Sequence, residues 1–338
     1  MRYDDVYLRG IGVFLGEPEP LESAIARGEY SAAEAARSQQ RAAAVIARPV
    51  DELPPPLMAV HAGREALRDI AELPDSVLYG HVHHQGLDFW SPACYLRDQL
   101  GLPAGPGVTV TVGAMSNSAI AGFELAADRI MSGQDDTVLV AVGDRFGGAR
   151  FPRWSADPGI VYGDGAAAVV LTRRRGFAKL DATASWSDAS LEGLHRGHEP
   201  FRHANSPAPL DIGLRKRQWL SSTTRSGVYA RNANGVTEVV KRALADAQLD
   251  LADISVVCGP HYGRHLAHSQ ILQPLGIDES RSTTQLGLDL GHLGAGDQLV
   301  ALHYLMASGA VVPGDHVLLL GAGVGMTWTA AVLTMLSL

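Results

Sequence analysis

Two widely separated segments of the chain carry the side chains that a nucleophilic hydroxyl group needs. Ser116 comes after a predicted strand (108–113) and opens a helix with apolar residues at helical spacing. His292 and Asp297 lie in the segment Leu-Gly-His-Leu-Gly-Ala-Gly-Asp, five residues apart in a glycine-rich turn. A serine becomes a nucleophile at neutral pH when a base removes its proton and a third group orients that base. These residue types therefore predict a Ser-His-Asp set.

The start of the helix at Ser116 would support the same chemistry. A helix N-terminus offers unpaired backbone N–H groups and the positive end of the helix dipole, which stabilise a developing oxyanion. A glycine-rich turn at 321–325 exposes further N–H groups and is a second candidate for an oxyanion hole. It is equally consistent with a plain hairpin, and it is not a dinucleotide fingerprint because no helix follows it.

Each of these residues also has a structural interpretation. Serine is a preferred helix N-cap, so Ser116 could simply cap its helix, and Ser118 is a rival nucleophile by proximity. His292 could be a loop histidine beside an aspartate, Asp297, that caps the next helix. The residues alone leave both interpretations open.

Three histidines, His81, His83 and His84, form a cluster that suggests a metal site. His81 and His83 would point to opposite sides of a strand, and the sequence places no further close-set ligand beside them. We therefore predict histidines at a strand end in a polar pocket, and no metal site.

Alternating strands and helices must position these residues, which indicates an α/β protein. We expect strands at 6–15, 76–82, 108–115, 137–144, 254–261, 316–323 and 327–336, and a turn leading into a buried strand within 159–174. We expect helices at 58–73, 89–102, 118–133 and 236–250, and a turn plus helix at 290–309. The alanine-rich stretches 21–30 and 31–47 also favour helix.

The second part of the chain repeats the element order of the first, which divides it into halves 1–178 and 179–338. Matching the Ser-Gly pairs at 132–133 and 308–309 gives an offset of 176 residues, at which Ser116 is the counterpart of His292. Two halves related by a pseudo-two-fold axis would bring this hydroxyl and imidazole together. A polar segment at 186–233 interrupts the pattern and is either a lid or binding loop or a passive surface loop.

Composition narrows the class of protein. Of 338 residues, 46% are hydrophobic and 19% charged, so a large core is expected and disorder is not. The net charge of −8 argues against a nucleic-acid partner. No long apolar run or signal peptide is found, so no membrane association is expected. Two cysteines cannot form a disulfide framework, and a cytoplasmic location is the expectation.

Several motifs together resemble the 3-oxoacyl-[acyl-carrier-protein] synthase III enzymes of the thiolase superfamily. They are SNSAIAGFELA, YGDGAAAVVL, PHYGRHL, GHLGAGDQ and GAGVGMTW, in family order along nearly the whole chain. The YGDGAAAVVL segment resembles a very specific F-G-D-G-A-G-A strand signature, and GAGVGMTW a C-terminal G-G-G-F-T-W loop. The resemblance implies a five-layer αβαβα fold built from two thiolase-like halves, and a homodimer.

The chain departs from the family pattern at the residues that carry the chemistry. Ser116 stands where the family has its cysteine nucleophile, and His292 where it has an asparagine. His261 in PHYGRHL matches the family histidine, while Arg264 replaces the asparagine of that motif. The pattern, with Asp297 added, is similar to Ser/Cys-His-Asp acyltransferases and starter-unit enzymes of antibiotic and polyketide biosynthesis.

The resemblance implies a reaction at a thioester. In this hypothesis His292, oriented by Asp297, activates Ser116, which takes an acyl group from CoA or an acyl carrier protein and passes it to a small-molecule acceptor. The N–H groups of Ser116 and Val324 would bind the oxyanion, and His261 would help to bind carbonyl groups. No tightly bound cofactor is expected. Decarboxylative condensation that selects a polyketide starter unit, and a non-catalytic partner subunit, remain alternatives.

Basic side chains are candidate contacts for the phosphates of CoA or phosphopantetheine, or for an acidic carrier protein. We assign Arg264 and Arg153 to this role, and Arg145, Arg150 and the 215–217 segment could also take part. Scattered solvated charges are the alternative interpretation.

Overall fold

The computed structural model describes residues 1–148, 150–201 and 209–337, and its largest element is a mixed sheet. The strand order is β5-β4-β6-β7-β1-β8-β11-β10-β9. The strands are β1 (Tyr7–Leu15), β4 (Ser76–Gly80), β5 (Thr109–Val112), β6 (Thr137–Asp144), β7 (Gly165–Thr172), β8 (Ala178–Ser187), β9 (Ile254–Cys258), β10 (His316–Gly323) and β11 (Thr327–Met335). A separate two-stranded sheet pairs β2 (Glu17–Pro20) with β3 (Ala42–Val45).

The same pairing pattern occurs at both ends of the large sheet. β4 is parallel to β6, β6 antiparallel to β7, and β7 antiparallel to β1. In the other part, β9 is parallel to β10, β10 antiparallel to β11, and β11 antiparallel to β8. The two parts join where β1 and β8 pair at Tyr7–Lys179 and Leu8–Ala178. The order and direction of the strands therefore repeat, as the offset in the sequence predicts.

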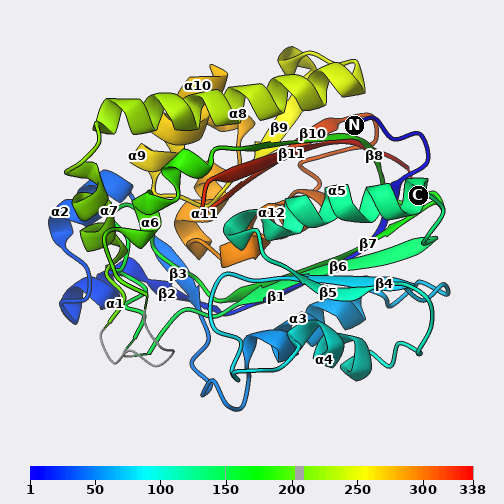
Figure 1. Cartoon of the computed structure of the whole chain (residues 1–338), viewed down its shortest axis with the longest axis horizontal. Helices are drawn as coiled ribbons and strands as arrows, with labels where there is room; N and C mark the ends of the chain where they lie inside the picture. Colours follow the sequence, from blue (N-terminus) through cyan, green and yellow to red (C-terminus); the bar gives the residue numbers. More distant parts are fainter. Residues whose placement is uncertain (149, 202–208, 338) are drawn as a thin grey trace.

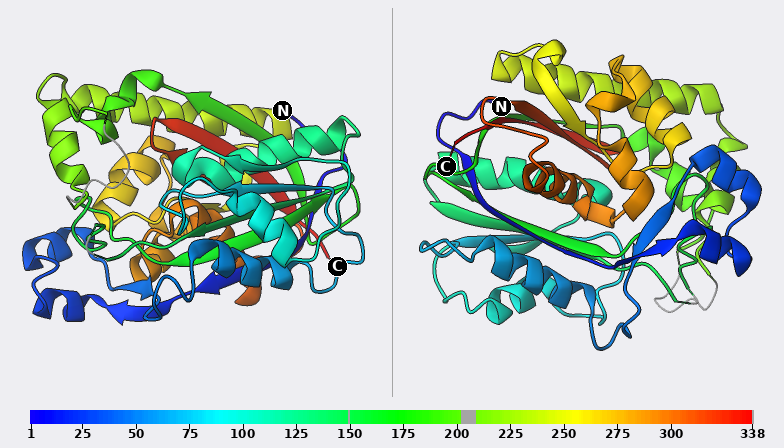
Figure 2. Two further views of the ribbon diagram at one scale, coloured as in Figure 1. Left: turned by 60° about the horizontal axis from the view of Figure 1, so that its bottom comes forward. Right: turned by 180° about the vertical axis from the view of Figure 1, so that it is seen from behind.

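Helices and sheets alternate in five layers, which confirms the thiolase-like αβαβα fold (Figures 1 and 2). Helices α5 and α12 lie in the middle layer, between the β8–β11 part of the sheet and the β1–β7 part. Helices α3 and α4 cover one outer face, and α8 covers the other. The main helices are α3 (Pro55–Ala66), α4 (Pro92–Gln99), α5 (Ser118–Met131), α8 (Arg225–Ala247), α11 (Thr284–Leu290) and α12 (Asp297–Ala307).

The middle layer is the core that holds the two parts together. The apolar side of α5, with Ile120, Phe123 and Ile130 fully buried, shares one hydrophobic cluster with Leu299 and Leu302 of α12. Burial of such side chains stabilises the fold by about 1.5–3 kcal/mol each. Because α5 and α12 begin close to Ser116 and His292, this packing also fixes the two helix starts relative to each other.

Several segments differ from the sequence-based expectation; β2, α11 and the short helices within 264–275 were not expected, and three further differences concern longer parts of the chain. The alanine-rich stretch 31–47 is helical only in α2 (Ala32–Ser38); its later part is strand β3, because pairing with β2 outweighs alanine's helix propensity. Strand β8 was not predicted. The 186–233 segment contains α6 (Gly193–Arg196), α7 (Ile212–Leu220) and the first residues of α8, so its described part is largely helical; residues 202–208 lie outside the described ranges.

The segment 321–325 belongs to a hairpin: residues 321–323 end strand β10, which pairs with β11 from His316–Thr334 to Gly323–Thr327. The remaining short helices are α1 (Leu21–Ala26), α9 (Arg264–Ala267) and α10 (Gln273–Leu275). Within the described ranges, no helix combines the length and apolar character needed to cross a bilayer.

Candidate functional site

Ser116 lies in a short 3₁₀ turn between β5 and α5. The turn η1 (Met115–Asn117) follows the strand, and Met115 has a positive φ of 52°. A non-glycine residue in this region is uncommon and marks a tight, locally strained turn. Ser116 itself is 7% exposed. The sequence therefore places its hydroxyl at a sharp strand-to-helix turn, close to the N-terminus of α5.

A continuous hydrogen-bond chain joins Ser116, His292 and Asp297. The Ser116 Oγ is 2.8 Å from His292 Nε2, and His292 Nδ1 is 2.6 Å from Asp297 Oδ2. A carboxylate oxygen can only accept, so Nδ1 carries the ring proton and donates it to Asp297. Nε2 is then the acceptor for the serine hydroxyl. This is the arrangement in which an imidazole removes a proton from a nucleophile.

Asp297 is held by more than its histidine. Its carboxylate is fully buried at the start of α12, and it accepts hydrogen bonds from Leu293 N (2.7 Å) and His261 N (2.8 Å). Burial alone would raise the pKa of Asp297, but the interactions with the His292 and His261 rings and the hydrogen bonds from His292 Nδ1 and His261 N hold this pKa below its usual value. Asp297 therefore remains an anion that orients the imidazole.

The His292 backbone is fixed against the segment that precedes β7. His292 N donates to Val161 O (2.7 Å), and Gly163 N donates to His292 O (2.9 Å). The rings of Tyr162 and Tyr262 flank the imidazole, with centroids 5.3 and 6.0 Å away. Burial lowers the pKa of His292, but the carboxylates of Asp297, Asp144 and Asp157 together outweigh this, with Asp297 the largest contributor, so the net shift is upward.

His261 lies on the other side of Asp297. Its backbone N–H binds the carboxylate, and its Nδ1 lies 3.2 Å from Gly291 O and 3.4 Å from Asp297 Oδ1. Its Nε2 is buried with no hydrogen-bond partner among the described residues. Burial is the main cause that lowers the pKa of His261, which favours a neutral ring. An unpaired ring nitrogen of this kind is available to a ligand atom.

The β10–β11 hairpin lies against the turn that carries Ser116. Gly323 is so close that a Cβ atom there would lie 2.2 Å from Ala114 O. Asn117, next to the serine, donates from Nδ2 to Thr329 Oγ1 (2.9 Å) and Thr327 Oγ1 (3.3 Å). Val324, the predicted oxyanion donor, follows Gly323 directly and is partly exposed. The hairpin thus lies beside the nucleophile, as an oxyanion-hole role requires.

The two arginines predicted to contact phosphates have carboxylate partners in this structure. Arg153 binds Asp164 through two hydrogen bonds of 3.0 Å, and this Asp164 is fully buried. Arg264 donates to Gln39 and to Glu279 (3.0 Å). These contacts give Arg153 and Arg264 structural roles, so the functional proposal below does not depend on either arginine.

The histidine cluster near position 80 makes local contacts. His81 Nδ1 lies 3.0 Å from His83 O, and the His83 ring packs on Phe146 and Phe151. Burial lowers the pKa of His83 to about 4. Over the described ranges there is no group of three His, Cys, Asp or Glu side chains that could hold a metal ion.

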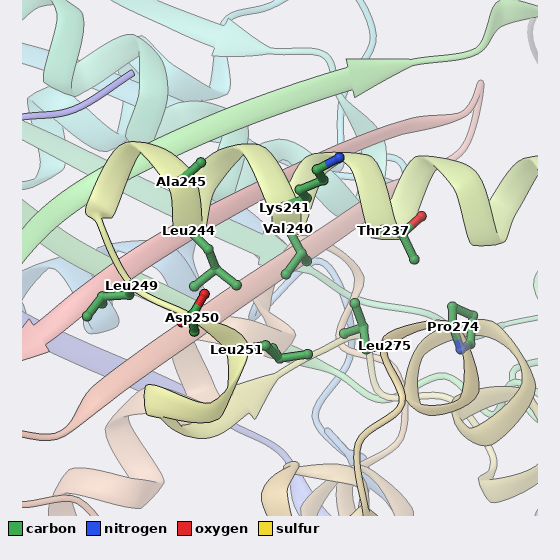
Figure 3. Close-up of a pocket in the computed structure, with 10 residues that line it drawn as sticks. All are labelled: Thr237, Val240, Lys241, Leu244, Ala245, Leu249, Asp250, Leu251, Pro274 and Leu275. Carbon is green, nitrogen blue, oxygen red and sulfur yellow. The ribbon is translucent and has the colours of Figure 1, made fainter.

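A separate apolar hollow lies on the far side of β9–β11, along α8 (Figure 3). Its lining residues are Thr237, Val240, Lys241, Leu244, Ala245, Leu249, Asp250, Leu251, Pro274 and Leu275. None of them contacts the Ser-His-Asp chain, so the hollow is not part of this site.

Sequence reasoning missed several residues around the site. Tyr162 and Tyr262 flank His292, Asn117 links Ser116 to the hairpin, and the buried Asp144 accepts an N–H bond from the turn before α12. A signal existed for two of them: Asn117 is the polar neighbour of the serine, and Asp144 is an acidic residue that ends an otherwise apolar strand.

Two family models match the two segments of the chain that contain the site residues. The model described as 3-oxoacyl-[acyl-carrier-protein] synthase III matches residues 111–188, which include Ser116. The model of the C-terminal part of the same family matches residues 244–335, which include His261, His292 and Asp297. The four residues of the site thus lie within the matched segments.

Individual proteins show the same similarity. The chain is 27% identical over 290 residues to the beta-ketoacyl-[acyl-carrier-protein] synthase III 3 of Streptomyces coelicolor, covering 82% of each chain. The structure of the acyltransferase ChlB3 superposes with a TM-score of 0.91 at 35% identity, covering 99% of this chain and 98% of that one. The 3-oxoacyl-(acyl carrier protein) synthase III of Pseudomonas aeruginosa PAO1 superposes with a TM-score of 0.78 at 19% identity, covering 99% of each chain, and supports the fold alone.

Proposed function

The chain belongs to the 3-oxoacyl-[acyl-carrier-protein] synthase III family, whose members catalyse acyl transfer and condensation, and from this premise we propose that it transfers an acyl group through an acyl-Ser116 intermediate. The acyl donor in this proposal is a thioester of CoA or an acyl carrier protein. The acceptor is a hydroxyl, an amine or a carrier protein, and no carbon–carbon bond forms. The observation that supports it best is the chain from Ser116 through His292 to Asp297.

In the first half-reaction, His292 Nε2 takes the proton of Ser116 as Oγ attacks the thioester carbonyl carbon. The resulting oxyanion is bound by the N–H groups of Ser116 and Val324. The tetrahedral intermediate collapses, the carbon–sulfur bond breaks, and the sulfur takes the proton from His292 and leaves as the thiol. Asp297 stabilises the imidazolium that forms in between.

In the second half-reaction, the neutral His292 takes a proton from the acceptor as the acceptor attacks the serine ester. The ester bond breaks, and His292 returns the proton to Ser116 Oγ. An ester is less activated than the thioester that a cysteine would form, and the His292–Asp297 pair offsets this by general base catalysis.

Decarboxylative condensation is the competing function. In that reaction a histidine and an asparagine bind the malonyl carbonyl of the second substrate, and here the asparagine position holds His292, whose Nε2 faces Ser116. A side chain engaged in activating the nucleophile is less available for binding an enolate. The geometry therefore favours transfer over condensation, and a hydrogen-bonded nucleophile and base also argue against a non-catalytic subunit.

The biological setting of this proposal follows from similarity. The 35% identity to the acyltransferase ChlB3, over nearly the full length of both chains, supports an acyltransferase role. The further proposal of a role in secondary-metabolite biosynthesis rests on the resemblance of the Ser-His-Asp pattern to acyltransferases of that kind. Family members act on acyl-CoA and acyl carrier protein, which supports these as donors. We further propose a homodimer and a cytoplasmic location.

The test combines adduct mapping with product analysis. The purified protein is exposed to a panel of acyl-CoAs, and the adduct is measured by intact mass and located by peptide mapping. Ser116→Ala should lose the adduct. Ser118→Ala is the matched control, because Ser118 is also buried and its Oγ already accepts from Ala114 N (3.1 Å). Adduct retained in Ser116→Ala, or lost only in Ser118→Ala, would refute the assignment.

Products separate the three functions. Acyl-enzyme is mixed with malonyl carrier protein and, separately, with an alcohol or amine acceptor. An ester or amide without release of carbon dioxide supports transfer. A 3-oxoacyl product with release of carbon dioxide supports condensation, and the absence of any acyl-enzyme supports the non-catalytic subunit.

A further inference from the structure

A second buried carboxylate, Asp144, lies behind the Ser-His-Asp chain and takes no part in the mechanism above. Asp144 is the last residue of β6 and is fully buried. Buried carboxylates are costly unless their oxygens accept hydrogen bonds. The N–H groups that satisfy Asp144 therefore show which parts of the protein it holds.

Asp144 links two loops that are far apart in the sequence. Its Oδ1 accepts from Val82 N and His83 N, both at 2.8 Å, in the loop that follows β4. Its Oδ2 accepts from Ala295 N at 3.2 Å. Ala295 lies in the short turn η6 (Gly294–Gly296), which connects His292 to α12.

Gly294 provides independent support for this contact. It has a positive φ of 67°, and a Cβ atom at this position would lie 2.1 Å from Asp144 Oδ2. Any side chain at 294 would push the carboxylate away or distort the turn. The turn is thus built so that Asp144 can approach its backbone closely.

The turn at 293–296 sets the geometry of the base. Asp297 must reach back over this turn to His292 Nδ1 and to Leu293 N. A change in the path of the turn would move the carboxylate relative to the imidazole, or the imidazole relative to Ser116. Displacements of about 1 Å from sites outside the reacting atoms can cost about 100-fold in rate.

We propose that Asp144 is a positioning residue that fixes the turn between His292 and Asp297 against the loop after β4 and so keeps the imidazole in line with Ser116. The inference rests on the proposed function for its effect on acyl transfer. Its effect on the state of His292 can be measured without any acyl donor.

Electrostatics point in the same direction. Burial is the main cause that raises the pKa of Asp144 to about 7, against the lowering effect of its N–H donors. The Asp144 charge is also one of the causes that raise the pKa of His292. The phenol of Tyr79, whose pKa is raised by burial and by Asp144, is another titratable group that faces this carboxylate. Removing the charge should therefore lower the pKa of His292.

Asp144→Asn tests the proposal with little change in volume. The amide oxygen can still accept from Val82 N and His83 N, but the amide NH₂ then faces Ala295 N–H without a hydrogen bond. We expect acylation of Ser116 to be about 10- to 100-fold slower, with the donor KM unchanged within about twofold. The acid limb of the pH–rate profile should move to lower pH.

A second readout uses no acyl donor. NMR titration of histidine-labelled protein, with the His292 signal assigned by His292→Gln, should show a lower His292 midpoint in Asp144→Asn than in the wild type. Asp135→Asn is the matched control: Asp135 is also buried, precedes the opposite end of β6, and pairs with Arg129. That variant should lose stability but leave the His292 midpoint unchanged.

The outcomes separate the two proposals. A His292 midpoint in Asp144→Asn that equals that of the wild type, or acylation within twofold of the wild-type rate, overturns the positioning role. A wild-type protein that forms no adduct overturns the proposed function, while the His292 shift still decides the role of Asp144. Asp144→Ser is made in parallel and read in the same way if the asparagine variant does not fold.

Discussion

The exchange of Asp297 for asparagine is the sharpest test of the hydrogen-bond chain. It removes the charge with almost no change in volume. The carboxylate accepts from His292 Nδ1, Leu293 N and His261 N, but an amide has only one oxygen. Leu293 N binds Oδ1, whereas His261 N and His292 Nδ1 both bind Oδ2. If the amide oxygen takes the place of Oδ1 and accepts from Leu293 N, the NH₂ group faces His261 N and His292 Nδ1.

This arrangement has a defined consequence for the base. His292 must then carry its proton on Nε2, which lies 2.8 Å from Ser116 Oγ, and a protonated Nε2 cannot take the serine proton. A change of tautomer of this kind costs about 10⁴-fold in kcat. At about 1.4 kcal/mol for each tenfold change, the barrier rises by about 5 kcal/mol.

The assay is rapid-quench acylation by the best acyl-CoA, followed by intact mass. Thermal melting shows that Asp297→Asn is folded, and Asp135→Asn serves as the control for loss of a buried carboxylate elsewhere. We expect the control to acylate at close to the wild-type rate. A rate for Asp297→Asn within tenfold of wild type would refute the tautomer argument.

Three other predictions follow from the same contacts. The acylation rate should rise with pH through the pKa of His292, because only the neutral ring is a base. Burial lowers this pKa, but neighbouring carboxylates raise it. An acylation rate that stays constant on the acid side of this pKa contradicts the prediction. Arg153→Ala should lower the free energy of unfolding by up to about 3–5 kcal/mol, because the buried Asp164 then keeps only the more distant Arg145 (4.0 Å) as a cation. The expected result is a lower Tm with an unchanged donor KM; a raised KM at unchanged Tm would instead support a phosphate contact. In Gly294→Ala the free energy of unfolding in urea should fall by about 2 kcal/mol or more, and most of the acylation activity should be lost. The reasons are the φ of 67° at this position and the carboxylate oxygen 2.1 Å from the new Cβ. A variant with the wild-type unfolding free energy and acylation rate would contradict this.

The relation between Ser116 and His292 could be predicted because it depends on a repeat. A fixed offset of 176 residues links two similar strand-turn-helix units, and the fold places their helix starts together. Apolar residues recur at helical spacing in α5, and α12 is buried on nearly all sides, so both sequences predict helices packed in the core. Local patterns of this kind survive in the sequence, since they arise from each element separately.

Contacts of single polar groups could not be predicted in this way. Arg153 was assigned to phosphates by its charge, but its partner is Asp164, and only the tertiary fold buries that carboxylate. Asp144 binds backbone groups at 82, 83 and 295, and backbone N–H groups leave no mark on the sequence. Strand β3 could not be predicted for a related reason, because its partner strand β2 lies more than twenty residues earlier in the sequence.

Ser116 and His292 lie far apart along the chain, and this separation determines when the site can form during synthesis and folding. As synthesis proceeds, Ser116 leaves the ribosome long before His292, so the nascent chain carries a serine with the ordinary reactivity of an alcohol. Contacts between such distant segments form late in folding. In the proposed mechanism, a polypeptide that lacks the 292–297 segment therefore has no base for Ser116, and acyl transfer requires both segments to be synthesised and packed.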